Sequence, residues 1–139
     1  MNEPQYTLIF LKPIAIQRGL VGEILSRFEK KGFRFKALKL IRMTREKTEE
    51  LYSIHRGKHF FEDLVNSIAG KEIVAAILEG RNAVEVVRRM IGSTDPTKAE
   101  PGTIRGDYGL DITENIIHAS DSWESFIREA KILFPEFNI

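Results

Sequence analysis

Six consecutive apolar residues, Ile-Val-Ala-Ala-Ile-Leu at positions 73–78, constrain the fold of this chain more than any other feature. A short continuous apolar run of this kind is typical of a β-strand that is covered on both faces. The chain has 139 residues, of which 42% are hydrophobic, enough for one compact core and too little for two full domains. We therefore expect one domain, residues 1–139, organised around this strand.

Strand and helix patterns alternate along the rest of the chain. Residues 6–11 are predicted as a strand that ends at Lys12-Pro13, because proline cannot continue a central ladder. Residues 33–43 alternate as a second strand, with Phe33, Phe35 and Ala37 expected on one face. Helical spacing predicts helices over residues 20–31, 44–52, 60–69, 83–91 and from 123 onward.

The order of these elements predicts the fold class. The predicted order is strand, helix, strand, helices, strand, helix, strand and helix, which corresponds to a β-α-β-β-α-β pattern. This pattern indicates an α/β ferredoxin-like sandwich with a four-stranded antiparallel sheet and surrounding helices. Residues 93–113 are rich in turn-forming pairs and are predicted as one long loop, which inside a compact domain is usually functional. This fold hosts many unrelated functions, so the activity has to be argued from the site.

Composition excludes several classes of protein. The 21 basic and 20 acidic residues leave a net charge of +1, which gives no electrostatic case for a general binder of nucleic acid or membrane surfaces. There is no cysteine, which excludes a disulfide scaffold, a Cys-ligated metal and a thiol nucleophile. No signal-peptide pattern and no apolar run near the roughly 20 residues of a membrane span is present, so we expect a soluble cytoplasmic protein.

Residues 115–122, Asn-Ile-Ile-His-Ala-Ser-Asp-Ser, place one histidine on a short apolar run directly before a polar helix start. Strand alternation predicts His118 and Ile116 on one face and Ile117 and Ala119 on the other, and Asp121 or Ser122 is expected to cap the following helix. A histidine beside a helix N-terminus suits phosphate chemistry, because imidazole is largely neutral and nucleophilic near pH 7 and the backbone N–H groups favour an anion.

Other interpretations of the histidines stay open at this point. A single histidine on an apolar strand is more often a hydrogen-bonded core residue than a catalyst. His55 and His59 have the i, i+4 spacing of a metal pair, but no third ligand is visible, so we interpret them as surface or substrate-rim residues. The sequence contains no Walker loop, no GxGxxG after a strand and no HExxH, so the usual nucleotide and zinc motifs are absent.

Taken together, motifs along nearly the whole chain resemble those of the nucleoside diphosphate kinases. They are Lys12-Pro13 with Gln17-Arg18-Gly19, Tyr52 with Phe60-Phe61, Glu79-Gly80, Thr94-Asp95-Pro96, Pro101-Gly102-Thr103-Ile104-Arg105-Gly106-Asp107, and residues 115–122 with Glu129. The chain departs from the family where Ile14-Ala15 replaces the usual Asp-Gly or Asp-Ala, and where His59 replaces a common proline.

The resemblance implies a ping-pong exchange, in which the γ-phosphoryl of a nucleoside triphosphate moves to His118 and from there to a nucleoside diphosphate. A phosphoramidate on imidazole keeps the transfer potential that a serine phosphate would lose. In the family the Glu129 carboxylate fixes the ring and leaves Nδ1 free to attack. The catalytic residues implied in this way are His118, Glu129, Lys12, Tyr52 and Ser120.

The resemblance also implies how the nucleotide is held. Cations and hydroxyls at Lys12, Arg88, Arg105, Tyr52 and Thr94 are expected at the phosphates, where phosphoryl transfer needs positioning and neutralisation of charge. Asn115 and Lys12 are expected at the ribose, and Phe60 under the base, with Leu64 one helical turn later and Ile112 opposite. Because stacking accepts every base, broad base tolerance follows. Mg²⁺ would arrive on the nucleotide, because the sequence offers no dedicated carboxylate cage.

The implied partners are nucleoside di- and triphosphates and further copies of the chain, as a hexamer or a tetramer, with no stable nucleic-acid complex. Two rivals remain. One is a non-catalytic paralogue that uses the cleft for regulation or nucleic-acid binding, and the other is a purely structural oligomer.

Overall fold

The computed structural model of the chain describes residues 4–139. Its strands are β1 (Pro4–Leu11), β2 (Arg34–Arg42), β3 (Glu72–Arg81) and β4 (Ile117–Ala119). Its helices are α1 (Pro13–Gln17), α2 (Val21–Lys31), α3 (Arg45–Leu51), the 3-10 turn η1 (Ser53–His55), α4 (Phe61–Ile68), α5 (Ala83–Ile91), α6 (Ile104–Tyr108) and α7 (Trp123–Leu133).

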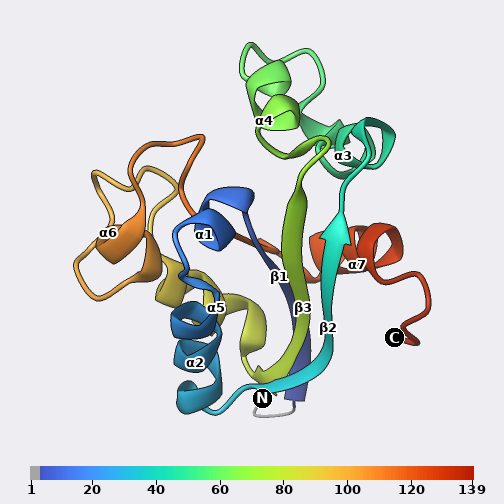
Figure 1. The fold of residues 1–139 in the computed structure, drawn as a ribbon. Helices are drawn as coiled ribbons and strands as arrows, with labels where there is room; N and C mark the ends of the chain where they lie inside the picture. The colour runs from blue at the N-terminus through green and yellow to red at the C-terminus, as the bar shows by residue number, and fades with distance from the viewer. Residues whose placement is uncertain (1–3) are drawn as a thin grey trace.

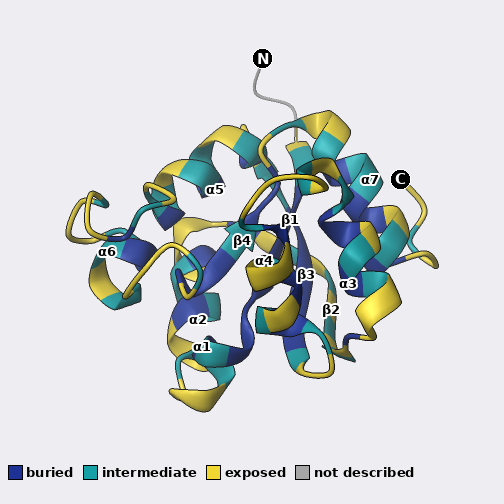
Figure 2. Ribbon diagram, turned by 90° about the horizontal axis from the view of Figure 1, so that it is seen from above, coloured by how far each residue is buried: buried dark blue, intermediate teal, exposed yellow. Residues whose placement is uncertain are grey.

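The four strands form one antiparallel sheet in the order β2-β3-β1-β4, which confirms the predicted ferredoxin-like sandwich. Residues 73–78 of β3 are buried throughout, as the apolar run predicts. Helices α2 and α5 cover one face of the sheet, and α7 with the α3–α4 unit covers the other, so two apolar cores lie on either side (Figure 1). Figure 2 shows the buried positions along the strands and on the inward sides of the helices.

Most predicted helices are confirmed together with their end signals. Thr44 caps α3 by accepting a hydrogen bond from the Lys47 N–H, and Ser122, not Asp121, caps α7. Gly32 ends α2 at φ 112°, a backbone conformation that residues with a Cβ rarely adopt. Residues 93–113, however, are not a loop throughout, because Thr103 caps the five-residue helix α6. Among residues 4–139, none of the helices has the length and apolarity to span a bilayer.

The expected alternation of β2 is wrong at one point. A register shift between Phe35 and Ala37 leaves Phe35 opposite Leu78 and Ala37 opposite Ile77. Phe33 and Phe35 therefore pack into the core under α2 and α5, whereas Ala37 packs into the opposite core. A bulge of this kind inserts one residue and reverses which side chains face each core.

The alternation predicted around His118 is also wrong, because Ile116 does not lie in the strand. Its φ is 80°, and the Ile117 N–H donates to the Asn115 carbonyl at 2.9 Å, which closes a γ-turn. The turn sends Ile116 into the same core as Ile117 and Ala119 and leaves His118 on the other face. A β-branched residue at positive φ is strained, and such strain concentrates at functional sites.

Candidate active site

His118 lies in the middle of β4, beside Phe10 of β1, and its ring stacks on the Phe10 ring at 4.7 Å with an interplanar angle of 21°. Its Nε2 is 2.8 Å from Oε2 of Glu129, and the Ser120 hydroxyl donates to Oε1 of the same carboxylate at 2.6 Å. The His118 side chain is 28% exposed and that of Glu129 only 4%. The ring therefore reaches the surface while the groups that hold it are buried.

Glu129 is charged in spite of its burial. Desolvation opposes its ionisation, but His118, Ser120 and Arg128 outweigh that cost and hold the pKa of the carboxyl below its ordinary value. A carboxylate only accepts hydrogen bonds, so the proton of the neutral ring resides on Nε2 of His118. Nδ1 then carries the free lone pair, and it makes no hydrogen bond to any residue between 4 and 139.

Three basic residues donate hydrogen bonds to backbone carbonyls in or near β4. Arg105 of α6 donates to the carbonyls of Ile117 at 2.7 Å and Gly92 at 3.0 Å. Arg88 of α5 donates to the Ala119 carbonyl at 3.4 Å. The backbone N–H of Lys12, at the end of β1, donates to the Ile116 carbonyl at 2.8 Å. These bonds hold the sequence-predicted cations close to the strand that carries His118.

Burial and mutual repulsion lower the basicity of two of these cations. Burial, and then the charge of Arg105, lower the pKa of Lys12 to about 8, although Asp111 opposes the shift. Burial and the neighbouring Arg88 lower the pKa of Arg105 to about 10. Like charges gathered in a desolvated place are costly in the free protein, and a phosphate among them would relieve that cost.

Three further predicted residues are Asn115 and Thr94, which lie at the segment before β4, and Tyr52, which lies near Glu129. The Asn115 amide donates to the Thr94 carbonyl at 3.1 Å, which ties Thr94 to the segment before β4, while the buried Oδ1 of Asn115 has no partner in the described structure. The Lys12 ammonium donates to the Thr113 carbonyl at 3.2 Å. The Tyr52 hydroxyl is buried without a partner within residues 4–139, and burial and then Glu129 raise its pKa. Such orphaned polar atoms are the ones a ligand satisfies.

The predicted base-binding residues come from two segments. Phe60 is the half-buried residue at the start of α4, and Leu64 packs toward the core one turn later in the same helix. Ile112 is 57% exposed and lines a hollow of about 680 Å³ with residues of its own segment and with Asp95 and Thr97. Ser67 of α4 and residues 113–114 line a cavity of about 70 Å³ beside Lys12.

Sequence reasoning missed one residue of this site. Arg128 lies 3.5 Å from the Glu129 carboxylate. No sequence signal indicates this contact, because neighbouring residues on a helix point in different directions. The rings of His55 and His59 each lie 5.3 Å from the Phe60 ring, next to the residue predicted at the base.

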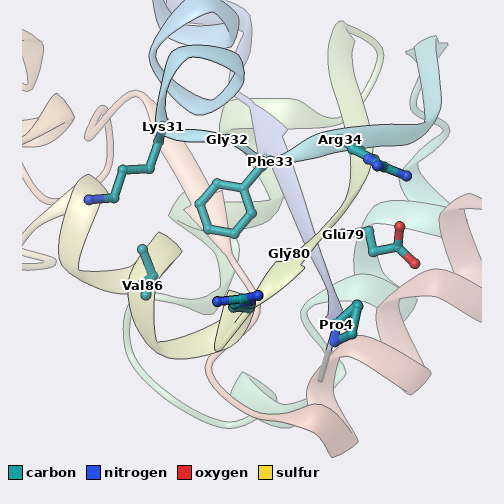
Figure 3. A pocket seen from close by; sticks show the side chains of 9 residues that line it. Pro4, Lys31, Gly32, Phe33, Arg34, Glu79, Gly80 and Val86 are labelled. Carbon is teal, nitrogen blue, oxygen red and sulfur yellow. The ribbon is translucent and has the colours of Figure 1, made fainter. Parts of the chain in front are cut away.

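Two alternative site types find no support in the described part of the chain. Residues 4–139 contain no group of three histidine, aspartate or glutamate side chains arranged to hold a metal ion. A hollow of about 460 Å³ lies at the other end of the sheet, lined by Phe33, Gly80, Arg81 and Pro4 among others (Figure 3). Pro4, which lines this hollow, is the first residue of β1, whereas His118 pairs with Phe10 near the last residue of that strand. The hollow is therefore remote from His118.

The arrangement around His118 has the chemistry of a phosphoryl acceptor. A neutral ring with one fixed N–H presents its other nitrogen at the surface, and a buried carboxylate is ready to stabilise the positive ring that forms when Nδ1 is phosphorylated. Lys12, Arg88 and Arg105 supply positive charge beside it. No protein base is needed, because the attacking nitrogen is already unprotonated.

Comparison with known proteins identifies the family. The family model of nucleoside diphosphate kinase matches residues 5–139. The chain is 59% identical to a nucleoside diphosphate kinase of Hyperthermus butylicus over 133 residues, which are 96% of this chain and 94% of that protein. It is 50% identical to a nucleoside diphosphate kinase of Saccharolobus solfataricus, over 97% of this chain and 98% of the relative.

Solved structures agree in fold over nearly the full chain. The nucleoside diphosphate kinase of Aquifex aeolicus superposes with a TM-score of 0.91 at 44% identity, covering 95% of this chain and 96% of that one. A halophilic nucleoside diphosphate kinase from Halobacterium salinarum, in complex with CDP, superposes with a TM-score of 0.91 at 40% identity, over 95% of this chain and 88% of that one. The chain belongs to the nucleoside diphosphate kinase family.

Proposed function

We propose that His118 carries the phosphoryl group in the nucleoside diphosphate kinase reaction of this chain. Nδ1 attacks the γ-phosphorus of a nucleoside triphosphate, the nucleoside diphosphate leaves, and a second diphosphate takes the group back from the ring. The observation that carries the proposal is the Glu129–His118 hydrogen bond at 2.8 Å, which fixes the ring with Nδ1 free, on a strand whose carbonyls accept hydrogen bonds from Arg88 and Arg105.

The surrounding residues act on charge and position. Lys12, Arg88 and Arg105 neutralise the phosphate oxygens, whose charge spreads in the loose transition state of phosphoryl transfer. Thr94 and the orphaned Tyr52 hydroxyl are proposed as further phosphate donors. As the ring becomes positive on phosphorylation, the buried Glu129 carboxylate stabilises it, and Ser120 keeps that carboxylate in place.

Recognition of the rest of the nucleotide is proposed at the two rims of the site. Asn115, whose buried Oδ1 lacks a partner in the described structure, and Lys12 are placed at the ribose hydroxyls. Phe60 and Leu64 on one side and Ile112 on the other are placed around the base. A CDP complex of the Halobacterium salinarum relative supports nucleotide binding by this fold.

Mg²⁺ fits this site as an ion carried by the nucleotide. The described residues form no metal cage, whereas their cations favour phosphates, and Mg²⁺ usually keeps several waters and binds phosphate oxygens. When bound, the ion would neutralise part of the phosphate charge. The chain would hold it only through the phosphates that Lys12, Arg88 and Arg105 bind.

Labelling tests the proposal. Incubation of the protein with γ-³²P-ATP alone should give an acid-labile label that a nucleoside diphosphate removes, and His118→Asn should abolish it while the fold is retained. Lys12→Met should retain some label. Equal labelling of wild type and His118→Asn would refute the proposal. A wild-type protein that binds nucleotides without taking label would support the non-catalytic paralogue instead.

We also propose that the chain works as a homo-oligomer, a hexamer or a tetramer. Leu38 and Leu40 are 53% and 62% exposed on β2, which is an edge strand of the sheet. A long edge strand with exposed leucines is a surface that pairing with a second copy would cover. Analytical ultracentrifugation should show a smaller species for the double variant Leu38→Lys, Leu40→Lys than for wild type. An unchanged mass would place the interface elsewhere.

A further inference from the structure

Arg128 links three parts of the site through one guanidinium group. Its Nη1 donates to the Leu51 carbonyl at 3.1 Å, and its Nη2 lies 3.5 Å from Oε2 of Glu129. That oxygen is the one that accepts the His118 Nε2 hydrogen bond. The Arg128 side chain is 29% exposed, so its contacts are partly shielded from water.

Both contacts of Arg128 are electrostatically favourable. Leu51 is the last residue of α3, and the carbonyls at a helix C-terminus are unpaired and carry partial negative charge, which a cation stabilises. The Glu129 carboxylate is 4% exposed, and in such surroundings a nearby positive charge acts more strongly than at the surface. Arg128 thus contributes to keeping Glu129 ionised.

The position of Arg128 also joins the two sides of the site. Leu51 precedes Tyr52, η1 and α4, the unit that carries Phe60, whereas Glu129 holds the ring of His118. We propose that Arg128 is a positioning residue, which fixes the Glu129 carboxylate and ties it to the α3–η1–α4 unit, and thereby aims Nδ1 of His118. This inference rests on the proposed function, because it assigns Arg128 a part in phosphorylation of that ring.

Loss of Arg128 should change the pH dependence of His118 phosphorylation. The other titratable groups that face this pair are Tyr52 at the end of α3, His55 of η1 and Asp121 before α7. The charged side chains that line the same hollow as Arg128 are Glu50, Glu124 and Lys131. None of these groups replaces the positive charge next to Glu129, since Tyr52 is neutral, the acidic groups carry no positive charge and burial lowers the pKa of His55. The exposed Lys131 makes no ion pair with Glu129 in the described structure. Without Arg128 the pKa of Glu129 rises, and the acid limb of the reaction moves to higher pH.

Three variants test the inference. Arg128→Met removes the charge and the hydrogen bond, whereas Arg128→Lys keeps the charge without the planar guanidinium group. Lys131→Met is the matched control, because Lys131 is an exposed cation in the same hollow between α3 and α7. Rapid-quench labelling of His118 should be about tenfold slower in Arg128→Met, with KM changed less than about twofold and the acid limb at higher pH. Arg128→Lys should restore the acid limb and part of the rate.

The outcomes separate this inference from the proposed function. A wild type without label refutes the kinase chemistry, and with it the role of Arg128. Labelling of Arg128→Met that matches Lys131→Met in rate and pH profile overturns the role of Arg128 and leaves the chemistry intact. If Arg128→Met does not fold, Arg128→Lys decides through its rate, since a labelling rate equal to that of Lys131→Met overturns the inference.

Discussion

The floor of the site is formed by β4 and α7, and its rim is formed by α4 and residues 109–116. The two parts differ in how they are held. On the floor, the ring of His118, the Ser120 hydroxyl and the Glu129 carboxylate are joined by hydrogen bonds of 2.6 and 2.8 Å. On the rim, Phe60 is half-buried, and Ile112 is 57% exposed in a segment without strand or helix. The floor is thus held by short hydrogen bonds between buried or partly buried groups, whereas the rim residues are more exposed.

This difference matches what each part has to do. Phosphoryl transfer depends on position within fractions of an ångström, so the acceptor ring is fixed by buried partners. The broad base tolerance predicted from the sequence requires an open surface and no shape-specific pocket, and stacking on one ring would provide such a surface. Substitutions on the floor should therefore lower the rate, and substitutions on the rim should weaken binding.

Glu129→Ala is expected to have the largest effect. The ring of His118 loses its orientation and the partner for its positive charge, so phosphorylation should slow by about 10²-fold while nucleotide affinity changes little. Single-turnover labelling and nucleotide titration measure the two quantities separately. Glu124→Ala, an exposed glutamate in the first turn of α7, is the matched control. A loss of affinity in Glu129→Ala as large as the loss of rate would contradict a floor that only orients.

Phe60→Ala tests the rim. Loss of the stacking ring should weaken binding by about 1–3 kcal/mol, similarly for ADP, GDP, CDP and UDP, with the rate at saturation nearly unchanged. Phe60→Leu retains apolar area without the aromatic face and separates stacking from simple burial. Isothermal titration with the four diphosphates gives the result. If the binding of only one of the four diphosphates weakens, the site recognises that base selectively, and the model of a base-tolerant surface is wrong.

Lys12 connects floor and rim, and its charge depends on pH. Its pKa in the free protein is about 8, so it loses its proton as the pH rises through 8, whereas a bound phosphate favours the charged form and raises that pKa. Binding of ADP should therefore take up a proton near pH 8.5, and affinity should fall by up to about tenfold per pH unit above 8. Calorimetry in buffers of different ionisation enthalpy detects the uptake. Lys71→Met, an exposed lysine at the same small cavity, should leave it unchanged, and Lys12→Met should abolish it.

Much of the fold follows from the sequence, because its signals are local. The apolar run at residues 73–78, the cap at Thr44 and the stop at Gly32 each specify the backbone around them, and the structure has all three as predicted. The faces of β2 and the segment before β4 were predicted wrongly. A bulge at residues 35–37 and the positive φ of Ile116 arise from tertiary packing, and alternation alone does not indicate either.

The candidate site shows the same division. His118, Ser120 and Glu129 meet as predicted, since the helix cap at Ser122 sets how α7 leaves β4. The meeting of Arg128 with Leu51 depends on how α3 packs on α7, a contact between residues 77 positions apart that no local pattern encodes. The position of Ile112 likewise depends on the path of residues 109–116, which contain no strand or helix.

Ile112→Ala should have the smallest effect, and it is the sharpest test of whether the rim closes on the base. The side chain is already 57% exposed, so its removal should cost little in stability and less than about 1 kcal/mol in binding. A double-mutant cycle with Phe60→Ala isolates the interaction between the two sides. If both residues contact the same base, the loss in the double variant should differ from the sum of the single losses by at least about 0.5 kcal/mol. Additive losses would mean that only the Phe60 side binds the base, which then rests on one face of the site.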